Sequence, residues 1–255
     1  MRLIYIIGQI LRYKEFLLTY KTRGHRIKHL EDYQHLFPIK SSTTLAGIVA
    51  DLICDGNLQG DPKWRIDFTS KSIKELKRFE KEMIVLFNIK GKIRKCTTNK
   101  FGKTYNIAFN CAPITRILFL CGVPAGQKVL LKFNIPKWIK KDKECFRRFA
   151  QRVFTCEGGL MHEKNRKMPQ IRFNMHKEEN IEDEFIGEVA KFLEKYFKIK
   201  STIKKQKPIN SRKDNKIMIS RRMYITGENV IKFFNEIQFE GEKQKTLKAK
   251  LPNLA

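Results

Sequence analysis

Two acidic residues occupy the same local context in the two halves of the chain. Residues 52–58 contain the order Cys-Asp-Gly, and residues 154–160 contain Cys-Glu-Gly with a leucine at the same distance behind it, so that Asp55 corresponds to Glu157. Carboxylate oxygens are the ligands that Mg²⁺ prefers in proteins. Paired metal ions with water between phosphates are what phosphodiester hydrolysis requires. The repeated motif therefore predicts a metal site of this kind.

Each acid is expected at the end of a helix. Residues 45–55 have a helical pattern, with an N-cap candidate among residues 42–44 and Gly56 as the stop. Small residues recur at every fourth position and would let another helix approach closely. The partial negative charge of a helix C-terminus disfavours a carboxylate, so an acid kept there twice suggests a compensating cation. Two such helices side by side would bring Asp55 and Glu157 together at a Mg²⁺ site.

The similarity extends beyond these motifs and indicates a duplication. In each copy an alternating strand, an amphipathic helix, a basic β-rich stretch and a closing apolar helix follow the acid in the same order. The predicted order is helix, two strands, helix, two strands, helix, with residues 135–139 as a linker that contains a rigid proline. The matched segments are residues 64–68 and 170–173, 73–86 and 185–196, 90–106 and 200–222, and 114–121 and 229–237.

The charge of the chain limits its class of partner. Its 255 residues include 53 Lys and Arg against 26 Asp and Glu, a formal net charge of +27. An excess of that size opposes a compact fold through self-repulsion and is usual where the partner is a polyanion. Nucleic acid is favoured over a membrane surface, and a basic or ribosome-associated protein is the plainer alternative.

No part of the sequence indicates export or a membrane anchor. No apolar run reaches the ~20 residues that cross a bilayer, and the apolar start at residues 3–11 has no cleavage site behind it. Its apolar residues fit one face of a helix that docks on the core. The six cysteines show no metal-ligand spacing with histidine, which predicts reduced thiols. We therefore expect a protein of the cytoplasm or an organelle, not a secreted one.

Both basic stretches are typical of strands with one face on a core and the other on nucleic acid. Residues 90–106 carry six Lys or Arg and no acid, and residues 200–222 carry nine against only Asp214. These cations are interleaved with Ile, Tyr and Thr, as expected of strands that present phosphate and base contacts on one side. The predicted DNA contacts are Lys92, Arg94, Lys95, Lys100, Lys103, Lys204, Lys205, Lys207, Arg212, Lys213, Lys216, Arg221 and Arg222.

Residues 45–58, Leu-Ala-Gly-Ile-Val-Ala-Asp-Leu-Ile-Cys-Asp-Gly-Asn-Leu, resemble the signature helix of the LAGLIDADG homing endonucleases. Residues 146–158 resemble the second signature of single-chain members, and residues 122–128 and 135–139 resemble the segment that joins their halves. The resemblance runs from residue 45 to residue 240. It implies an α+β fold of tandem αββαββα repeats about a pseudo-twofold axis, with saddle-shaped antiparallel sheets in the major groove of double-stranded DNA. It also implies a monomer that cuts a long, specific site, as in intron homing.

The resemblance also implies a set of catalytic residues. The terminal acid of each signature is a metal ligand in this family, which here means Asp55 and Glu157 with Mg²⁺ or another divalent cation such as Mn²⁺. A basic residue just after the first long strand steadies phosphate charge, and those positions fall on Lys71 and His176 here, with Lys128 as a third basic candidate. The implied reaction is metal-dependent cleavage across the minor groove.

Some residues depart from the family pattern. Arg152 stands on the second signature helix where a small residue is usual, and Arg148 lies one turn earlier on the same face. Asp51 is a polar residue inside the first signature helix, so the packing of both helices is in question. Two other functions of the same fold stay open: a maturase that binds its own intron RNA, and a DNA-binding protein that does not cut. Retention of both acids favours the nuclease over either.

The expected domain boundaries follow from the two copies. An N-terminal extension of unknown role covers residues 1–43, the first repeat residues 44–135, the second repeat residues 136–240, and a basic C-terminal tail residues 241–255. Trp64 is expected to anchor the core or the linker rather than to stack on a base.

Overall fold

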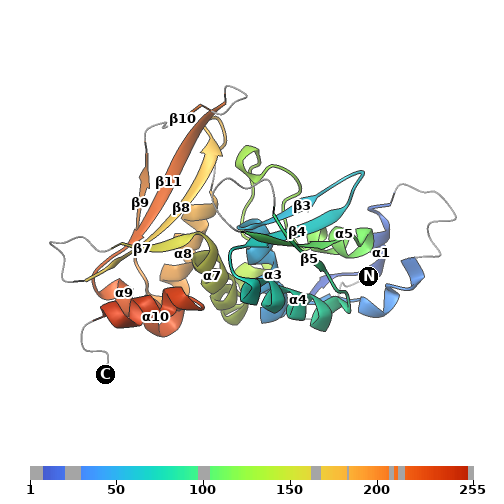
Figure 1. Ribbon diagram of the computed structural model, residues 1–255, viewed down its shortest axis with the longest axis horizontal. Coiled ribbons are helices and arrows are strands. Elements are labelled where there is room, and N and C mark those ends of the chain that lie inside the picture. The colour runs from blue at the N-terminus through green and yellow to red at the C-terminus, as the bar shows by residue number, and fades with distance from the viewer. Residues whose placement is uncertain are drawn as a thin grey trace, which may run out of the picture. The chain divides into compact units, whose positions relative to one another are not determined.

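The chain forms two compact units, Met1–Gly126 and Gln127–Ala255. The computed structural model describes residues 8–20, 30–96, 104–161, 168–182, 184–206, 210–211 and 216–251. Each unit contains an antiparallel sheet whose helices gather on one face (Figure 1). The fold is therefore α+β with two repeated sets of elements, as the sequence predicts.

The first unit follows the predicted order of helix, two strands, helix, two strands, helix. The hydroxyl of Ser42 accepts a hydrogen bond from the N–H of Leu45 and caps the opening helix. The strands form a sheet in the order β3-β4-β6-β5. The elements are α3 (Thr43–Ile53), β3 (Gly56–Gln59), β4 (Arg65–Ser70), α4 (Ile73–Phe87), β5 (Lys92–Lys95), β6 (Tyr105–Phe109) and α5 (Ala112–Leu120).

One face of this sheet is apolar and lies under helix α4. Ile66 and Phe68 of β4 pair with Phe109 and Ile107 of β6, and all four side chains are buried. Phe79 of α4 stacks on Phe68 with ring centroids 4.6 Å apart. Because side chains alternate along a strand, the residues between these point to the opposite face.

The N-terminal segment packs on the first unit. Its elements are β1 (Gln9–Leu11), α1 (Tyr13–Leu17), η1 (Gln34–Leu36) and β2 (Ile39–Lys40). The guanidinium of Arg116 on α5 lies over the ring of Tyr20 at 4.2 Å and over the ring of Trp64 at 4.0 Å. Such cation–π contacts fix both aromatics against the unit.

The expectation of a docking helix at residues 3–11 is wrong for the part that is described. Residues Gln9–Leu11 form strand β1, which pairs antiparallel with β2. A short apolar run fits a helix or a strand equally well. The pairing with residues far along the chain decides the matter here.

The second unit repeats the order of the first and extends it. Asp142 caps helix α7 by accepting from the N–H of Cys145 at 2.8 Å. The sheet has the order β10-β11-β8-β7, and β9 also pairs with β11. The elements are η2 (Lys128–Leu130), α6 (Lys137–Lys141), α7 (Lys143–Glu157), β7 (Gly158–Met161), β8 (Gln170–Glu178), α8 (Phe185–Phe197), β9 (Thr202–Lys205), β10 (Asn210–Ser211), β11 (Ile217–Ile225), α9 (Glu228–Glu236) and α10 (Glu242–Lys250).

Aromatic rings fill the space between the second sheet and its helices. Phe154 of α7 contacts Phe173 of β8 at 5.5 Å and Phe233 of α9 at 4.8 Å between centroids. Phe185 of α8 lies 6.5 Å from Phe173. Helices α7, α8 and α9 therefore share one core with this sheet.

Two segments are more structured than the sequence predicts. Residues 135–139, expected as a linker, enter helix α6, and both Ile135 and Ile139 are buried. The segment expected as a basic tail contains helix α10, whose Leu247 has no exposed surface. A single large apolar residue in a charged sequence gives almost no amphipathic pattern, so this helix depends on tertiary packing.

Two expectations about membranes and thiols can be compared with the described residues. Among them, no helix combines the length and the apolar character needed to span a bilayer. The six cysteines are unpaired with one another in this structure, and that they are reduced thiols stays a prediction.

Candidate functional site

The two predicted metal ligands lie where a helix gives way to a strand. Glu157 is the last residue of α7 and is half-buried. Asp55 lies two residues beyond the end of α3, in the turn before β3, and is exposed. It is therefore just outside the last helical turn in which the sequence placed it. Both residues still lie at the C-terminal end of a helix.

The glycine behind each acid is required by the close approach of backbone to backbone. A Cβ on Gly56 would lie 2.7 Å from the Cα of Leu52, and a Cβ on Gly158 would lie 2.4 Å from the carbonyl oxygen of Phe154. Both distances are shorter than any side chain tolerates, so the chain can turn from helix to strand only at glycine. The repeated Asp-Gly and Glu-Gly pairs thus set the position of the acid.

The strand register shows that the two copies correspond residue by residue. Gly56 pairs with Phe68, and Gly158 pairs with Phe173. Phe68 then pairs with Ile107 and Phe173 with Met223. Counting three residues on from each phenylalanine gives Lys71 in the first copy and His176 in the second, so these two side chains hold equivalent positions.

The three predicted basic residues differ in their surroundings. Lys71 is exposed in the bend after β4. His176 is also exposed but lies inside β8, not after it, because β8 continues to Glu178 where β4 has already ended. Lys128 begins helix η2, and its carbonyl accepts from the ammonium of the buried Lys177 at 2.8 Å.

The register divides the predicted DNA contacts between the two faces of the sheets. Lys92 and Arg94 of β5 alternate with Ile93, which pairs with the buried Ile107, so both cations point away from the helices. In the second unit Lys204 and Arg222 pair with each other and with Asn174 on the same open face. The side chains that alternation places on the helix side are Lys95, Lys205 and Arg221.

The open faces carry polar groups besides these cations. In the first unit the amide of Asn106 donates to the hydroxyl of Thr69 at 3.4 Å, and Arg65 pairs with Asp67 at 2.5 Å. In the second, Asn174 Oδ1 and Arg222 Nε are buried atoms with no hydrogen-bond partner among the described residues. Amides and guanidinium groups are the side chains that read base edges.

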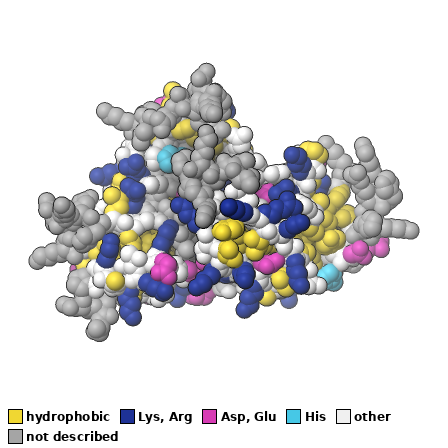
Figure 2. Space-filling view, in the orientation of Figure 1, with side chains coloured by type: hydrophobic (Ala, Val, Ile, Leu, Met, Phe, Trp, Pro, Cys, Tyr) yellow, Lys and Arg dark blue, Asp and Glu magenta, His cyan; other side chains and the backbone are white. Residues whose placement is uncertain are grey.

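Some of the predicted contacts cannot be placed on either face. Lys216 pairs with Glu178 at 3.6 Å just before β11. Lysine and arginine side chains dominate the charged part of the surface seen in Figure 2. The predicted contacts that lie outside the described residues are Lys100, Lys103, Lys207, Arg212 and Lys213.

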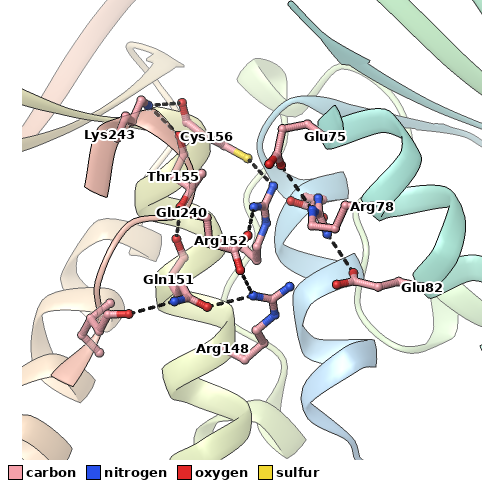
Figure 3. A network of polar contacts seen from close by, with 12 residues as sticks. Glu75, Arg78, Glu82, Arg148, Gln151, Arg152, Thr155, Cys156, Glu240 and Lys243 are labelled. Atoms are coloured by element: carbon pink, nitrogen blue, oxygen red, sulfur yellow. Dashed lines mark hydrogen bonds and ion pairs between the residues drawn. The ribbon is translucent and has the colours of Figure 1, made fainter. Parts of the chain in front are cut away.

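The arginines that depart from the family pattern have a partner within their own unit. Glu240, in the loop between α9 and α10, forms ion pairs with both Arg148 and Arg152 (Figure 3). Arg148 also donates to the side chain of Gln151 at 2.8 Å. Arg152 is only 1% exposed, so the carboxylate compensates a charge that would be costly to bury alone.

Asp51 on the first signature helix is compensated in the same way. Its buried carboxylate lies 2.6 Å from the guanidinium of Arg78 on α4. Arg78 also pairs with Glu75 at 3.2 Å and with Glu82 at 2.8 Å (Figure 3). One arginine thus ties the first signature helix to the helix that covers the sheet.

Comparison with known proteins agrees with this arrangement. Residues 144–238 match the family described as LAGLIDADG-like domain. The match begins in α7 and ends just after α9, so it covers the whole repeated order of the second unit. The second unit therefore contains a LAGLIDADG-like domain, and the chain has the LAGLIDADG fold.

Solved proteins share this LAGLIDADG fold at low sequence identity. The homing endonuclease I-WcaI, solved bound to its DNA recognition sequence, is 15% identical with a TM-score of 0.52, over 93% of this chain and 98% of that one. Full-length WhiA from Thermatoga maritima is 14% identical with a TM-score of 0.51, over 84% of this chain and 62% of that one. At these identities the likeness concerns the fold.

A curated relative is similar over most of the LAGLIDADG chain. The replication factor C small subunit of Methanocaldococcus jannaschii is 28% identical over 245 residues, which are 89% of this chain. Those residues are 13% of that protein, so the chain spans a small part of the relative it matches.

The acids of this LAGLIDADG protein fit a magnesium ion by the chemistry of their donors. Mg²⁺ usually keeps several waters and takes one or two carboxylates together with substrate phosphates. Asp55 and Glu157 each offer a carboxylate beside backbone carbonyls, which is a hard-oxygen donor set. Among the described residues, no three His, Cys, Asp or Glu side chains gather as an all-protein cage. A magnesium ion at either carboxylate would fill its remaining positions with water and substrate phosphate.

Sequence reasoning missed the residues that hold the two LAGLIDADG helices. Arg78 and Glu240 compensate charges that the sequence shows on α3 and α7. Lys243 donates to carbonyls at the end of α7. The charges to be compensated were visible in the sequence, but a partner 88 positions away cannot be chosen from it.

Proposed function

We propose that this LAGLIDADG-family protein is a magnesium-dependent endonuclease that cuts both strands of a long, specific duplex DNA site and acts as a monomer. The proposal rests on a feature that both units share. In both units a helix gives way at Asp55 or Glu157 to a sheet whose open face carries amide, hydroxyl and cationic groups. A helix end and a sheet face of this kind supply a metal ligand and a DNA-binding surface in each half.

The open faces would bind the duplex. The major groove admits a β-ribbon, and asparagine and arginine can each make paired hydrogen bonds to a base edge. Arg94 and Lys204 hold equivalent positions on β5 and β9, where each neutralises phosphate charge. Asn106 pairs with Arg94 in the first unit, and Asn174 lies across Arg222 from Lys204 in the second; both amides read bases from a central strand.

The chain's own residues divide the chemistry between the two DNA strands. Asp55 in the first unit and Glu157 in the second would each ligate a divalent ion, which when bound would supply Lewis acidity and an activated water. Lys71 and His176 stand at equivalent positions and steady negative charge on the phosphate. The sequence left two other functions open, a maturase and a DNA-binding protein that does not cut. Either would bind nucleic acid with the same sheet faces and would not need the two acids.

Selection of cleaved sites from a randomised duplex DNA pool with Mg²⁺ tests the proposal. We expect one long sequence to be enriched at newly formed ends, and none with Asp55→Asn. Enrichment by binding without new ends would favour the non-cleaving DNA-binding protein. Retention of intron RNA with no duplex enrichment would favour the maturase.

A further inference from the structure

Lys243 on α10 lies at the C-terminal end of the second signature helix. Its ammonium donates to the carbonyl of Thr155 at 2.5 Å and to that of Cys156 at 3.3 Å (Figure 3). It also donates to the carbonyl of Gly158 at 2.6 Å. These carbonyls belong to the residues on both sides of Glu157. One side chain therefore binds the backbone that carries the acid.

A cation at this place meets two electrostatic needs. The last four carbonyls of a helix have no partner within it, and together they carry a partial negative charge. Glu157 adds a carboxylate to the final residue of α7. The repeated acid at a helix end suggested a compensating cation from the sequence alone, and in this unit the protein supplies part of it through Lys243.

Helix α10 is held in place by contacts other than those of Lys243. Phe239, just before the helix, is buried with its ring 5.1 Å from that of Phe233. Leu247 has no exposed surface. The backbone N–H of Glu240 donates to the hydroxyl of Thr155 at 3.0 Å. The packing of α10 thus holds the ammonium at the end of α7, and a change at position 243 leaves these packing contacts intact.

We propose that Lys243 is a positioning residue for Glu157. By binding the carbonyls on either side of the acid it fixes the turn from α7 into β7, and with it the direction of the carboxylate. The role rests on the proposed nuclease function and adds a residue to it. A displacement of a catalytic group by about 1 Å can cost about 100-fold in rate. Loss of the three hydrogen bonds should therefore slow cleavage of the DNA strand on which Glu157 acts.

The first measurement needs neither DNA nor metal. Amide hydrogen exchange over residues 152–161 should become several-fold faster in Lys243→Met, because the end of α7 opens more often without its cap. Lys245→Met is the matched control, since Lys245 lies on the same helix, is 75% exposed and pairs only locally with Glu242 among the described contacts. Exchange in the control should equal that of the wild type. Unchanged exchange in Lys243→Met would overturn the proposal whether or not the protein cuts DNA.

The second measurement follows cleavage of a selected site with the two strands labelled separately. Lys243→Met should slow one strand about 10- to 100-fold, with the same strand preference as Glu157→Gln and the opposite of Asp55→Asn. Lys243→Arg, which keeps a charged donor, should restore much of the rate, and DNA affinity should not change. Equal slowing of both strands would reduce Lys243 to a structural contact. If the wild type does not cleave, the nuclease proposal fails while the exchange measurement still decides the capping role.

Discussion

The carboxylate of Asp51 and the guanidinium of Arg78 lie 2.6 Å apart, and Asp51 has no exposed surface. The pair joins the first signature helix to α4, which covers the sheet. A polar residue inside that helix is therefore a structural tie and not a weakness in its packing.

Arg78→Met should lower the free energy of unfolding by about 3 kcal/mol, because removing one partner of a buried pair leaves a charge in the interior. Asp51→Leu combined with Arg78→Met should lose less, since no charge then remains buried. Urea denaturation measures both values, and Lys245→Met serves as the exposed control with no change. A double variant less stable than Arg78→Met would contradict this account.

Asp55→Asn and Glu157→Gln should each abolish double-strand cleavage and leave DNA affinity nearly unchanged. Each change removes a metal-binding oxygen without removing a side chain from the open sheet faces. Plasmid linearisation and a gel-shift titration on the same site check the two parts. Full activity in either variant would remove that acid from the mechanism.

Lys204 and Lys205 are neighbours on β9, and alternation sends them to opposite faces of the sheet. Each phosphate contact contributes about −0.9 to the slope of log K against log salt on duplex DNA. Lys204→Gln should therefore flatten that slope by about one contact, and Lys205→Gln should change it less. Fluorescence anisotropy over a salt series gives both slopes. Equal effects of the two changes would show that the open face is not the binding face.

Lys71 and His176 make the two halves chemically unequal. If His176 steadies phosphate charge as Lys71 does, His176→Ala should slow cleavage of its strand, and nicked DNA should accumulate. Strand-resolved time courses measure this, and His176→Lys should remove the difference between strands.

The rate of His176→Lys distinguishes two roles for His176. A slower strand in that variant would make the imidazole a base that accepts a proton from water. Identical strand profiles in the wild type and in His176→Ala would leave His176 an ordinary exposed residue of β8.

Among the six cysteines, the half-buried thiols should react faster than the buried ones. Burial raises the pKa of the Cys121 thiol to about 12, and burial with the nearby Asp142 carboxylate raises that of Cys145 to about 12. The thiolate is the reactive form, so below that pH both stay protonated and slow to react. Mass spectrometry after brief alkylation should find modification first at the half-buried Cys96, Cys111 and Cys156. Early modification of Cys121 in the folded protein would contradict its buried position.

The order of elements could be predicted from the sequence because each element has a local signature. Helices α4 and α8 carry apolar residues at helical spacing, and the strands that precede them alternate. The acid before each glycine marks a turn that only glycine permits, as the contacts of Gly56 and Gly158 show. These features depend on neighbours within a few residues, and such neighbours are fixed by the chain itself.

Charge partners and strand faces required the tertiary structure. The sequence shows Arg152 on α7 but not that Glu240 pairs with it, because the two residues meet only after α9 has packed on the core. It shows a run of lysines at β9 but not which of them shares a face with Arg222, since that depends on register with β11. Lys243 belongs to a segment that looked like a charged tail. Its three hydrogen bonds to carbonyls form because Leu247 and Phe239 bury apolar surface and so hold α10 against the unit. No local sequence pattern predicts that burial.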